Sequence, residues 1–200
     1  MPERRRAATV EEAVAEAQRF VGPVVLKGVA AYLLHKTELG LVKTNLVSPG
    51  DVRTAAEAIR ERAEVNGLKV EFLFSEQVHG DLEVVVGYKR DAAFGPTVMV
   101  GSGGVWAEFF DDVAIHVGGL DRARAERLLD RSRVGQMMAR ARGGWLCVEG
   151  VVSALCAVSA LGQANPDIVG IDINPLIVGR GHATAVDAAI ERRQPERNRT

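Results

Sequence analysis

Three apolar runs lie close together in the middle of the chain and constrain its fold more than any other feature. They read VEFLFSEQV (residues 70–78), LEVVVGYKR (82–90) and PTVMVGSGG (96–104), with short glycine-containing turns between them. Runs of this length, rich in β-branched and aromatic residues and bounded by turn residues, are typical of strands. Because the connections are short, we expect the three runs to be neighbouring antiparallel strands.

Helical patterns surround this strand cluster. Two capping-box signatures each precede apolar residues at helical spacing, namely Thr9 with Glu12 and Ser48 with Asp51. The segment CVEGVVSALCAVSALGQANP is apolar around most of a helical circumference, which predicts a buried helix stopped by Gly162 and Pro166. The chain closes with IVGIDINPLIV, a Gly-Arg-Gly turn and HATAVDAAI, which together predict a β-hairpin.

This order of elements favours an α+β fold over a strictly alternating doubly wound one, because strands and helices occur in separate groups. We expect two lobes, one over residues 9–80 and the other over residues 81–190. The polar ends, residues 1–8 and residues 191–200, are expected to be disordered.

Composition limits the partners that the chain can bind. Two hundred residues with 47% hydrophobic content can bury a sizeable core. The 25 basic and 26 acidic residues leave a formal charge of −1, so neither nucleic acid nor a membrane is an expected partner, and any phosphate binding must be local. The lack of an 18-residue apolar run and of a signal peptide predicts a soluble, cytoplasmic protein. Cys147 and Cys156 lack metal-ligand spacing and are expected as small core residues.

Lys27 follows the apolar strand Val-Val-Leu and is expected at its exit, beside a loop that contains His35, Lys36 and Gly40. One such loop can fold over a polyphosphate, with ammonium groups as point charges and a glycine that lets the backbone approach closely. The usual phosphate-loop pattern is absent. The alternative is that Lys27 is a solvated charge at a strand end.

The C-terminal hairpin brings Asn174 and Asp187 to either side of the turn at residues 179–181. If the numbers of paired residues sum to 361, the two face each other directly, and a sum of 360 or 359 makes them diagonal neighbours. Asp172 shares their face. An amide oxygen and carboxylates suit Mg²⁺, with phosphate oxygens and water completing its shell. The alternative is that these residues only shape a turn.

Further carboxylates are candidates for nucleotide or metal contacts. Glu76, at the end of a predicted strand and just before the lobe junction, can accept hydrogen bonds from a ribose. The segment GSGGVWAEFFDD contains Glu108, Asp111 and Asp112, which are candidate metal ligands or bases. The simpler interpretation is that each of these residues is an exposed charge.

Three long segments together resemble the ATP-grasp domain of the nucleoside-diphosphate-forming acyl-CoA synthetases. This group includes ADP-forming acetyl-CoA synthetase and is related to the β subunit of succinyl-CoA synthetase. The segments are PVVLKGVAAYLLHKTELGLV, GDLEVVVGYKRDAAFGPTVMVGSGGVWAEFFDDVAIHV and DINPLIVGRGHATAVDAAI, in the order of the family. The resemblance covers about residues 9 to 190.

The resemblance implies an ATP-grasp fold, in which two lobes hold ATP and Mg²⁺ bridges its phosphates. It implies that Lys27 contacts the phosphates and that Glu76 lies among the nucleotide contacts. It also implies that Asn174 and Asp187 are the magnesium ligands. The N-terminal lobe is expected to be shortened, because the helix and strand that in the family precede the helix before PVVLK have no match in this chain.

The implied reaction converts acyl-CoA, ADP and phosphate into acid, ATP and CoA through acyl phosphate and phosphohistidine. His35 matches a histidine that receives the phosphoryl group in some members, and Glu108 matches a position that orients that group. The overall reaction implies an α-like partner subunit that carries the CoA site and a phosphorylated histidine, within a homo- or hetero-oligomer.

Three positions depart from the family pattern: Leu41 replaces a glycine, and His116 and Gly119 replace an arginine and a proline. Such departures leave open a non-catalytic nucleotide-binding or assembly module derived from the family. A ligase with another acceptor, such as a carboxylate–amine ligase, fits the HKTELG and INPL segments less well.

Overall fold

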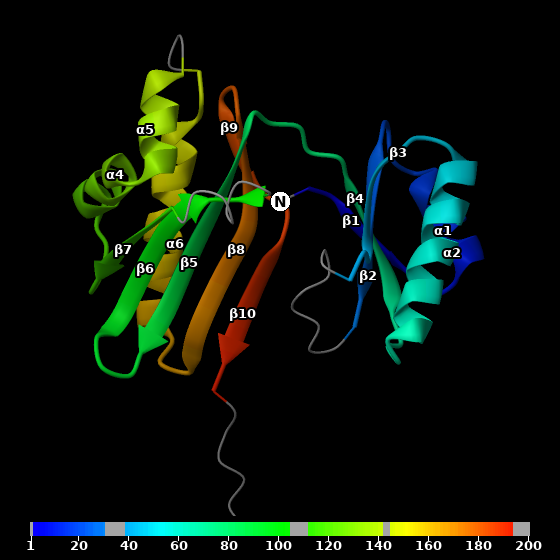
Figure 1. The fold of residues 1–200 in the computed structure, drawn as a ribbon, viewed down its shortest axis with the longest axis horizontal. Coiled ribbons are helices and arrows are strands. Elements are labelled where there is room, and N and C mark those ends of the chain that lie inside the picture. Colours follow the sequence, from blue (N-terminus) through cyan, green and yellow to red (C-terminus); the bar gives the residue numbers. More distant parts are fainter. Residues whose placement is uncertain (1, 31–38, 105–111, 142–144, 194–200) are drawn as a thin grey trace, which may run out of the picture. The chain divides into compact units, whose positions relative to one another are not determined.

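The structure is a computed structural model, and Figure 1 shows its ribbon. It describes residues 2–30, 39–104, 112–141 and 145–193. The chain divides into two compact units, residues 2–78 and residues 79–200. The described residues form two antiparallel sheets and five helices, which confirms the predicted α+β class.

The N-terminal unit is a four-stranded sheet covered by two helices. The strand order is β1-β4-β2-β3, with β1 (Arg4–Ala7), β2 (Val24–Val29), β3 (Val42–Leu46) and β4 (Glu71–Glu76). Helices α1 (Val10–Ala17) and α2 (Pro49–Val65) pack on one face of this sheet (Figure 1). A single apolar core therefore fills the space between sheet and helices.

Local sequence signals specify α2. The Ser48 hydroxyl accepts a hydrogen bond from the Asp51 amide, and the Asp51 carboxylate accepts one from the Ser48 amide, so the predicted capping box is confirmed. One stripe of the helix is buried, namely Val52, Ala55, Ala56, Ile59 and Ala63. Asn66 caps the C-terminal end, and Gly67 follows with a φ of 65°, in the left-handed region that suits glycine.

Residues 4–7, which were expected to be disordered, form strand β1, so that expectation is wrong. The strand pairs with β4, where Ala7 lies opposite Phe72. Ala7 is buried in the core, and the Arg5 guanidinium contacts the Glu16 carboxylate of α1. A run of arginines is compatible with an edge strand because edge strands often carry charged side chains. A strand therefore precedes α1 in the structure.

Of the three runs predicted to be neighbouring antiparallel strands, only the second and third are neighbours. β5 and β6 pair as expected, but β4 belongs to the N-terminal sheet, between β1 and β2. Phe72 and Phe74 of β4 are at most 2% exposed and pack in the core of that sheet. The turn at residues 79–81 therefore leads from one unit into the other and not between neighbouring strands.

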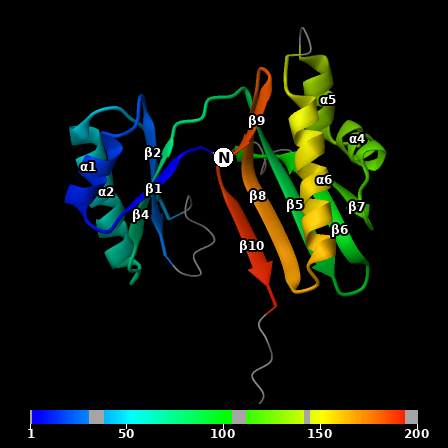
Figure 2. The ribbon, with the colours of Figure 1, turned by 180° about the vertical axis from the view of Figure 1, so that it is seen from behind.

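The C-terminal unit is a six-stranded sheet covered by three helices on one face. The strand order is β10-β8-β5-β6-β7, and β9 pairs with β8. The strands are β5 (Leu82–Asp91), β6 (Gly95–Ser102), β7 (Val113–Val117), β8 (Ile168–Gly179), β9 (His182–Ala185) and β10 (Ala188–Arg192). Helices α4 (Arg122–Arg131), α5 (Arg133–Arg140) and α6 (Val148–Ala164) lie on the side nearer the viewer in Figure 2. We call the opposite side, on which the described residues form no helix, the helix-free face.

Helix α6 is buried along one side only. Val151 and Leu155 are fully buried, whereas Val148 and Leu161 are 44% and 42% exposed, so the prediction of a fully buried helix is wrong. Gly162 does not end the helix. A Cβ atom there would lie 2.3 Å from the Tyr88 ring, so this glycine lets β5 and α6 approach closely.

The Tyr88 hydroxyl is buried and has no hydrogen-bond partner in the part of the chain that the structure describes. An unpaired buried hydroxyl carries a desolvation cost. Tyr88→Phe is therefore expected to raise the free energy of unfolding by about 1 kcal/mol, measured by urea denaturation. Tyr88→Leu is the control and should lower that free energy because it leaves a cavity. A clear loss of stability in Tyr88→Phe would show that the hydroxyl is paired.

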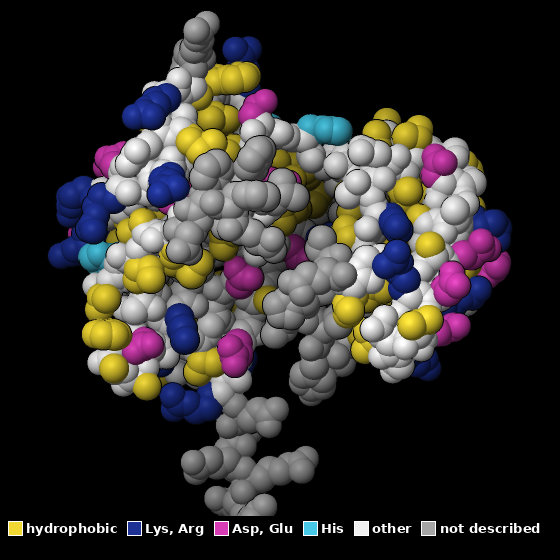
Figure 3. Space-filling view, in the orientation of Figure 1, with side chains coloured by type: hydrophobic (Ala, Val, Ile, Leu, Met, Phe, Trp, Pro, Cys, Tyr) yellow, Lys and Arg dark blue, Asp and Glu magenta, His cyan; other side chains and the backbone are white. Residues whose placement is uncertain are grey.

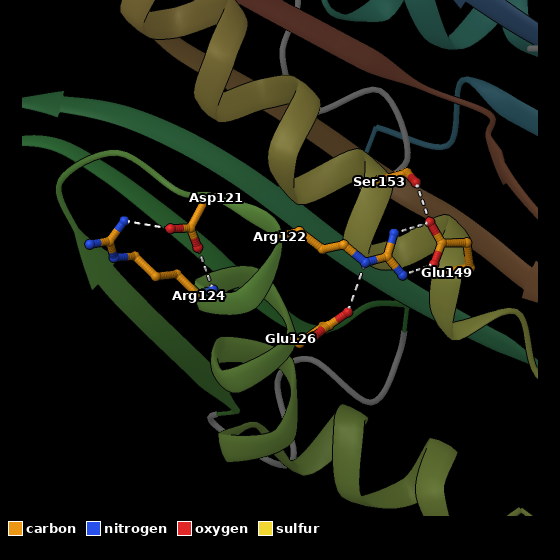
Figure 4. A network of polar contacts seen from close by, with 6 residues as sticks. All are labelled: Asp121, Arg122, Arg124, Glu126, Glu149 and Ser153. Carbon is orange, nitrogen blue, oxygen red and sulfur yellow. Dashed lines mark hydrogen bonds and ion pairs between the residues drawn. The ribbon is translucent and has the colours of Figure 1, made fainter.

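An exposed polar network joins the first turns of α4 and α6 (Figure 4). The Arg122 guanidinium donates to both carboxylate oxygens of Glu149 and to Glu126. These hydrogen bonds lower the pKa of Glu149. Asp121 caps α4 by accepting from the Arg124 amide, which lowers the pKa of Asp121. The side of α4 that carries Arg122 is thus directed toward α6.

The C-terminal strand extends further than the sequence indicated. Glu191 and Arg192 belong to β10, although residues 191–200 were expected to be disordered. The Arg193 amide continues this pairing by donating to the Asp167 carbonyl at 2.8 Å. Within the described ranges, no helix combines the length and the apolar character that a membrane crossing requires.

Candidate functional site

The C-terminal hairpin keeps one register from the pair of Gly179 and His182 to the pair of Gly170 and Glu191, and the register shifts at Arg192. Leu176 of β8 lies opposite Ala185 of β9, and Ile173 lies opposite Ala188 of β10, so the residue numbers sum to 361 in both pairings. Asp187 lies in the bend between β9 and β10 and, by this register, faces Asn174. Of the three registers that the sequence left open, the structure adopts the one with a sum of 361. The peptide bond between Asn174 and Pro175 is cis.

Asp172 brings a second carboxylate to this place. It lies opposite Gly87 of β5 and Ala189 of β10, while its neighbour Ile171 is packed in the core, so Asp172 belongs to the helix-free face. Partial burial raises the pKa of Asp172, and the charge of Asp187 raises it further. The two carboxylates are therefore close enough to repel each other.

This donor set fits a magnesium ion. Two carboxylates that repel each other in a partly desolvated place are stabilised by a divalent cation, and the Asn174 amide supplies a third oxygen. The described residues contain no cluster of three or more His, Cys, Asp or Glu side chains that could hold a metal. A sparse protein ligand set of this kind leaves positions for phosphate oxygens and water, as Mg²⁺ prefers.

Gly87 and Met99 lie beside Asp172 on this surface, and no sequence pattern predicts either of them. They pair across β5 and β6 in the row that contains Asp172. A Cβ atom at Gly87 would lie 2.7 Å from the Met99 Cγ atom, so the glycine makes room for the methionine on this face. Only the pairing register reveals that these residues share a row, because no local pattern marks them.

Lys27 lies within strand β2 and not at its end, so this part of the prediction is wrong. It is the fourth of six residues and pairs with Leu73 of β4. The strand continues past Lys27 because β4 provides pairing partners for Gly28 and Val29. Leu26 packs beneath the helices, so strand alternation directs Lys27 to the opposite face of the N-terminal sheet. The side chain is only 8% exposed.

Glu76 and Lys27 lie on opposite faces of the same sheet. Glu76 ends β4 opposite Val24, and Val24 packs in the core beneath the helices. Strand pairing therefore assigns Glu76 to the helix-bearing face, where it is exposed. The other predicted site residues of this region, His35 and Lys36, lie outside the described residues.

Asp112 has a structural role that the sequence did not reveal, and Glu108 and Asp111 lie outside the described residues. The Asp112 side chain is buried and accepts three hydrogen bonds of 2.9 Å, from the Ser102 hydroxyl and from the amides of Arg133 and Val134. These contacts join the end of β6 to the N-terminus of α5. These hydrogen bonds favour a structural role for Asp112 over the role of metal ligand or base that the sequence suggested.

The three departures from the family pattern are accommodated by packing. Leu41 is fully buried in the N-terminal core, and its carbonyl accepts from the Gly28 amide. His116 lies opposite the buried Val98 and so belongs to the helix-bearing face of its sheet. Gly119 lies against the Gln163 amide of α6.

Comparison with known proteins identifies the family. The model of the ATP-grasp domain matches residues 1–191. The ADP-forming acetate–CoA ligase I of Archaeoglobus fulgidus is 31% identical over 189 residues, which are 90% of this chain and 27% of that protein. The β subunit of the corresponding ligase I of Pyrococcus furiosus is 33% identical over 193 residues, which are 94% of this chain and 83% of that subunit. The chain therefore spans about a quarter of the first relative and most of the second.

Solved structures agree with this result. The acetyl-coenzyme A synthetase 1 of Ca. Korarchaeum cryptofilum, in complex with coenzyme A, Ca-AMPCP and HgCl⁺, superposes with a TM-score of 0.87 and is 34% identical. The match covers 96% of this chain and 86% of that one. PH1788 from Pyrococcus horikoshii superposes with a TM-score of 0.88 at 26% identity, over 98% of this chain and 85% of that one. The chain belongs to the ATP-grasp domain family of the ADP-forming acetyl-CoA synthetase β subunits.

Proposed function

We propose that this chain is the ATP-binding, β-like part of an ADP-forming acyl-CoA synthetase, an acid–thiol ligase whose substrate resembles acetyl-CoA. In the proposed reaction a phosphoryl group moves between a phosphohistidine and ADP. The observation that carries the proposal is the hairpin register, which sets Asn174 opposite Asp187 on a strand that also bears Asp172. This arrangement suits a nucleotide-bound magnesium ion.

Asn174 and Asp187 would hold Mg²⁺, and Asp172 would add negative charge beside it. When bound, the ion would neutralise part of the negative charge of the phosphates. Lys27 would contact the phosphates with a positive charge held on a rigid strand. Glu76 is proposed to accept hydrogen bonds from the nucleotide.

The residues outside the described ranges complete the proposal. His35 would receive the phosphoryl group through a ring nitrogen and pass it to a terminal oxygen of ADP, so that a P–N bond breaks as a P–O bond forms. Lys36 would neutralise phosphate charge, and Glu108 would orient the transferred group. Positioning and charge neutralisation dominate reactions of this type.

The relatives support the need for a partner. The Pyrococcus furiosus protein is named as a β subunit, which implies a separate α subunit. A Korarchaeum structure that contains coenzyme A and Mg-AMPPCP has a phosphohistidine segment that points towards the nucleotide binding site. We propose that an α-like, CoA-binding subunit presents such a histidine to this chain.

The first test is calorimetric titration of the 200-residue chain with Mg²⁺-ATP. We expect saturable binding below millimolar nucleotide that is lost when EDTA removes Mg²⁺. Lack of binding at millimolar nucleotide would contradict the proposal and favour an assembly module. Radiolabelled ATP then distinguishes an enzyme from a binding module, because only an enzyme forms an acid-labile phosphohistidine that His35→Ala abolishes.

A further inference from the structure

Helix α4 carries a stripe of arginines on its outward side. Arg124, Arg127 and Arg131 are exposed, and their spacing of three and four residues places them on one helical face. The buried side of the helix consists of Ala125, Leu128 and Leu129. Arg124 pairs with Asp121, whereas Arg127 and Arg131 have no ion pair with any described residue. Figure 3 shows basic side chains gathered over α4.

Helix α2 carries a matching stripe of the opposite charge. Glu57, Glu61 and Glu64 are exposed and lie on the side of the helix away from its buried residues. None of the three makes an ion pair within the part of the chain that the structure describes. Their spacing of four and then three residues is the spacing of the arginine stripe read in reverse.

The two stripes match in one antiparallel register. With the helices side by side, Arg124 faces Glu64, Arg127 faces Glu61, and Arg131 faces Glu57, so the numbers of each pair have the same sum. Both helices rise by about 1.5 Å per residue, so the three pairs stay aligned along the contact.

The residues beside the stripes fit the same register. A rotation of about 100° per residue puts Asp130 and Arg60 on the same flank of an antiparallel pair, with opposite charges. The match therefore includes a reversed pair of charges on one flank as well as the two stripes.

We propose that these two faces join copies of this chain, with α4 of one copy packed antiparallel on α2 of the next. The occupant of each face is thus a second copy, selected by charge complementarity. Because the two faces differ, the contact is head-to-tail and forms a ring or an open chain of copies. Exposed ion pairs are individually weak, so the association is weak and falls with ionic strength.

Charge reversal provides the test. One variant, Arg127→Glu with Arg131→Glu, makes both faces acidic, and the other, Glu57→Arg with Glu61→Arg, makes both faces basic. Sedimentation equilibrium at low salt should show that the wild type associates in a concentration-dependent way. Each variant alone should associate about tenfold or more weakly than the wild type, because like charges then face each other. An equimolar mixture of the two variants should regain wild-type association, since every contact between unlike copies is again complementary.

The matched control is Lys69→Glu with Lys89→Glu, which changes the net charge as the arginine variant does but lies outside both stripes. It should associate like the wild type. A wild-type chain that is monomeric at every concentration would overturn the proposal. So would variants that associate as the wild type does, or a mixture that fails to associate. The mixture also separates contact between copies from contact within one chain, because only the former is restored by mixing.

Discussion

Asp187→Ala is expected to weaken Mg²⁺-dependent binding of ATP at least tenfold, and Asn174→Ala should act in the same direction. Losing a residue that only supports a metal ligand costs about 10- to 100-fold in affinity or activity, so losing a ligand should cost no less. Calorimetric titration with ATP, with and without Mg²⁺, measures the effect. The comparison is informative because loss of a metal ligand should weaken only the Mg²⁺-dependent part of binding.

Asp81→Ala is the matched control, because it removes an exposed carboxylate from the same unit. It should leave both titrations unchanged.

Asp172→Asn removes the charge of Asp172 while keeping the size of its side chain. The pKa of Asp172 is raised in the folded state, so its ionised form destabilises the fold as pH rises above 3.8, the ordinary pKa of an aspartate. Without Mg²⁺, this variant should be more stable than the wild type at neutral pH, yet bind Mg²⁺-ATP more weakly. Unchanged binding in Asp187→Ala would refute the metal assignment.

Asp112→Ala is expected to lower the free energy of unfolding by about 3 kcal/mol, because buried donors lose their acceptor. The carboxylate serves the Ser102 hydroxyl and the first amides of α5. Removing it leaves these groups buried without a partner, and hydrogen bonds to a charged group are among the stronger ones. Chemical denaturation followed by circular dichroism gives the value.

Two further variants test the cause of this loss. Asp112→Asn retains an oxygen acceptor and the side-chain volume, so it should lose clearly less stability than the alanine variant. Asp130→Ala removes an exposed carboxylate from α4 and should change stability by no more than about 0.5 kcal/mol. If Asp112→Ala and Asp130→Ala were equally mild, the buried network would contribute little to the fold.

The elements predicted correctly are those whose information is local. The capping box of Ser48 and Asp51 and the buried stripe of α2 follow from residues within a few turns of one another. The C-terminal hairpin is also local, because the short turn between Gly179 and His182 brings its arms together and leaves only a few registers. The pairing of Asn174 with Asp187 could therefore be narrowed to three choices, of which the structure adopts one.

The errors involve contacts between distant segments. Strand β1 lies in a run of arginines that has no strand-like pattern, and only its pairing with β4 identifies it as a strand. Strand β4 belongs to the N-terminal sheet because Phe72 and Phe74 pack in the core of that unit, a contact that no local pattern indicates. The apolar run before Lys27 predicts a strand end there, whereas the strand continues because β4, whose Leu73 pairs with Lys27, lies more than forty residues away in the sequence. That Lys27 and Glu76 occupy opposite faces follows from the same register, which the sequence does not encode locally.

The continuous register of the C-terminal hairpin has a consequence for changes in chain length. Side chains alternate between the faces of a strand, so one residue inserted into or deleted from the turn at residues 179–181 moves every later side chain of that arm to the other face. Asp187 would then leave the face of Asp172 although no ligand had been substituted. Divergence by insertion or deletion is therefore constrained in this turn, whereas changes at the C-terminal side of β10 leave Asp187 on the face of Asp172.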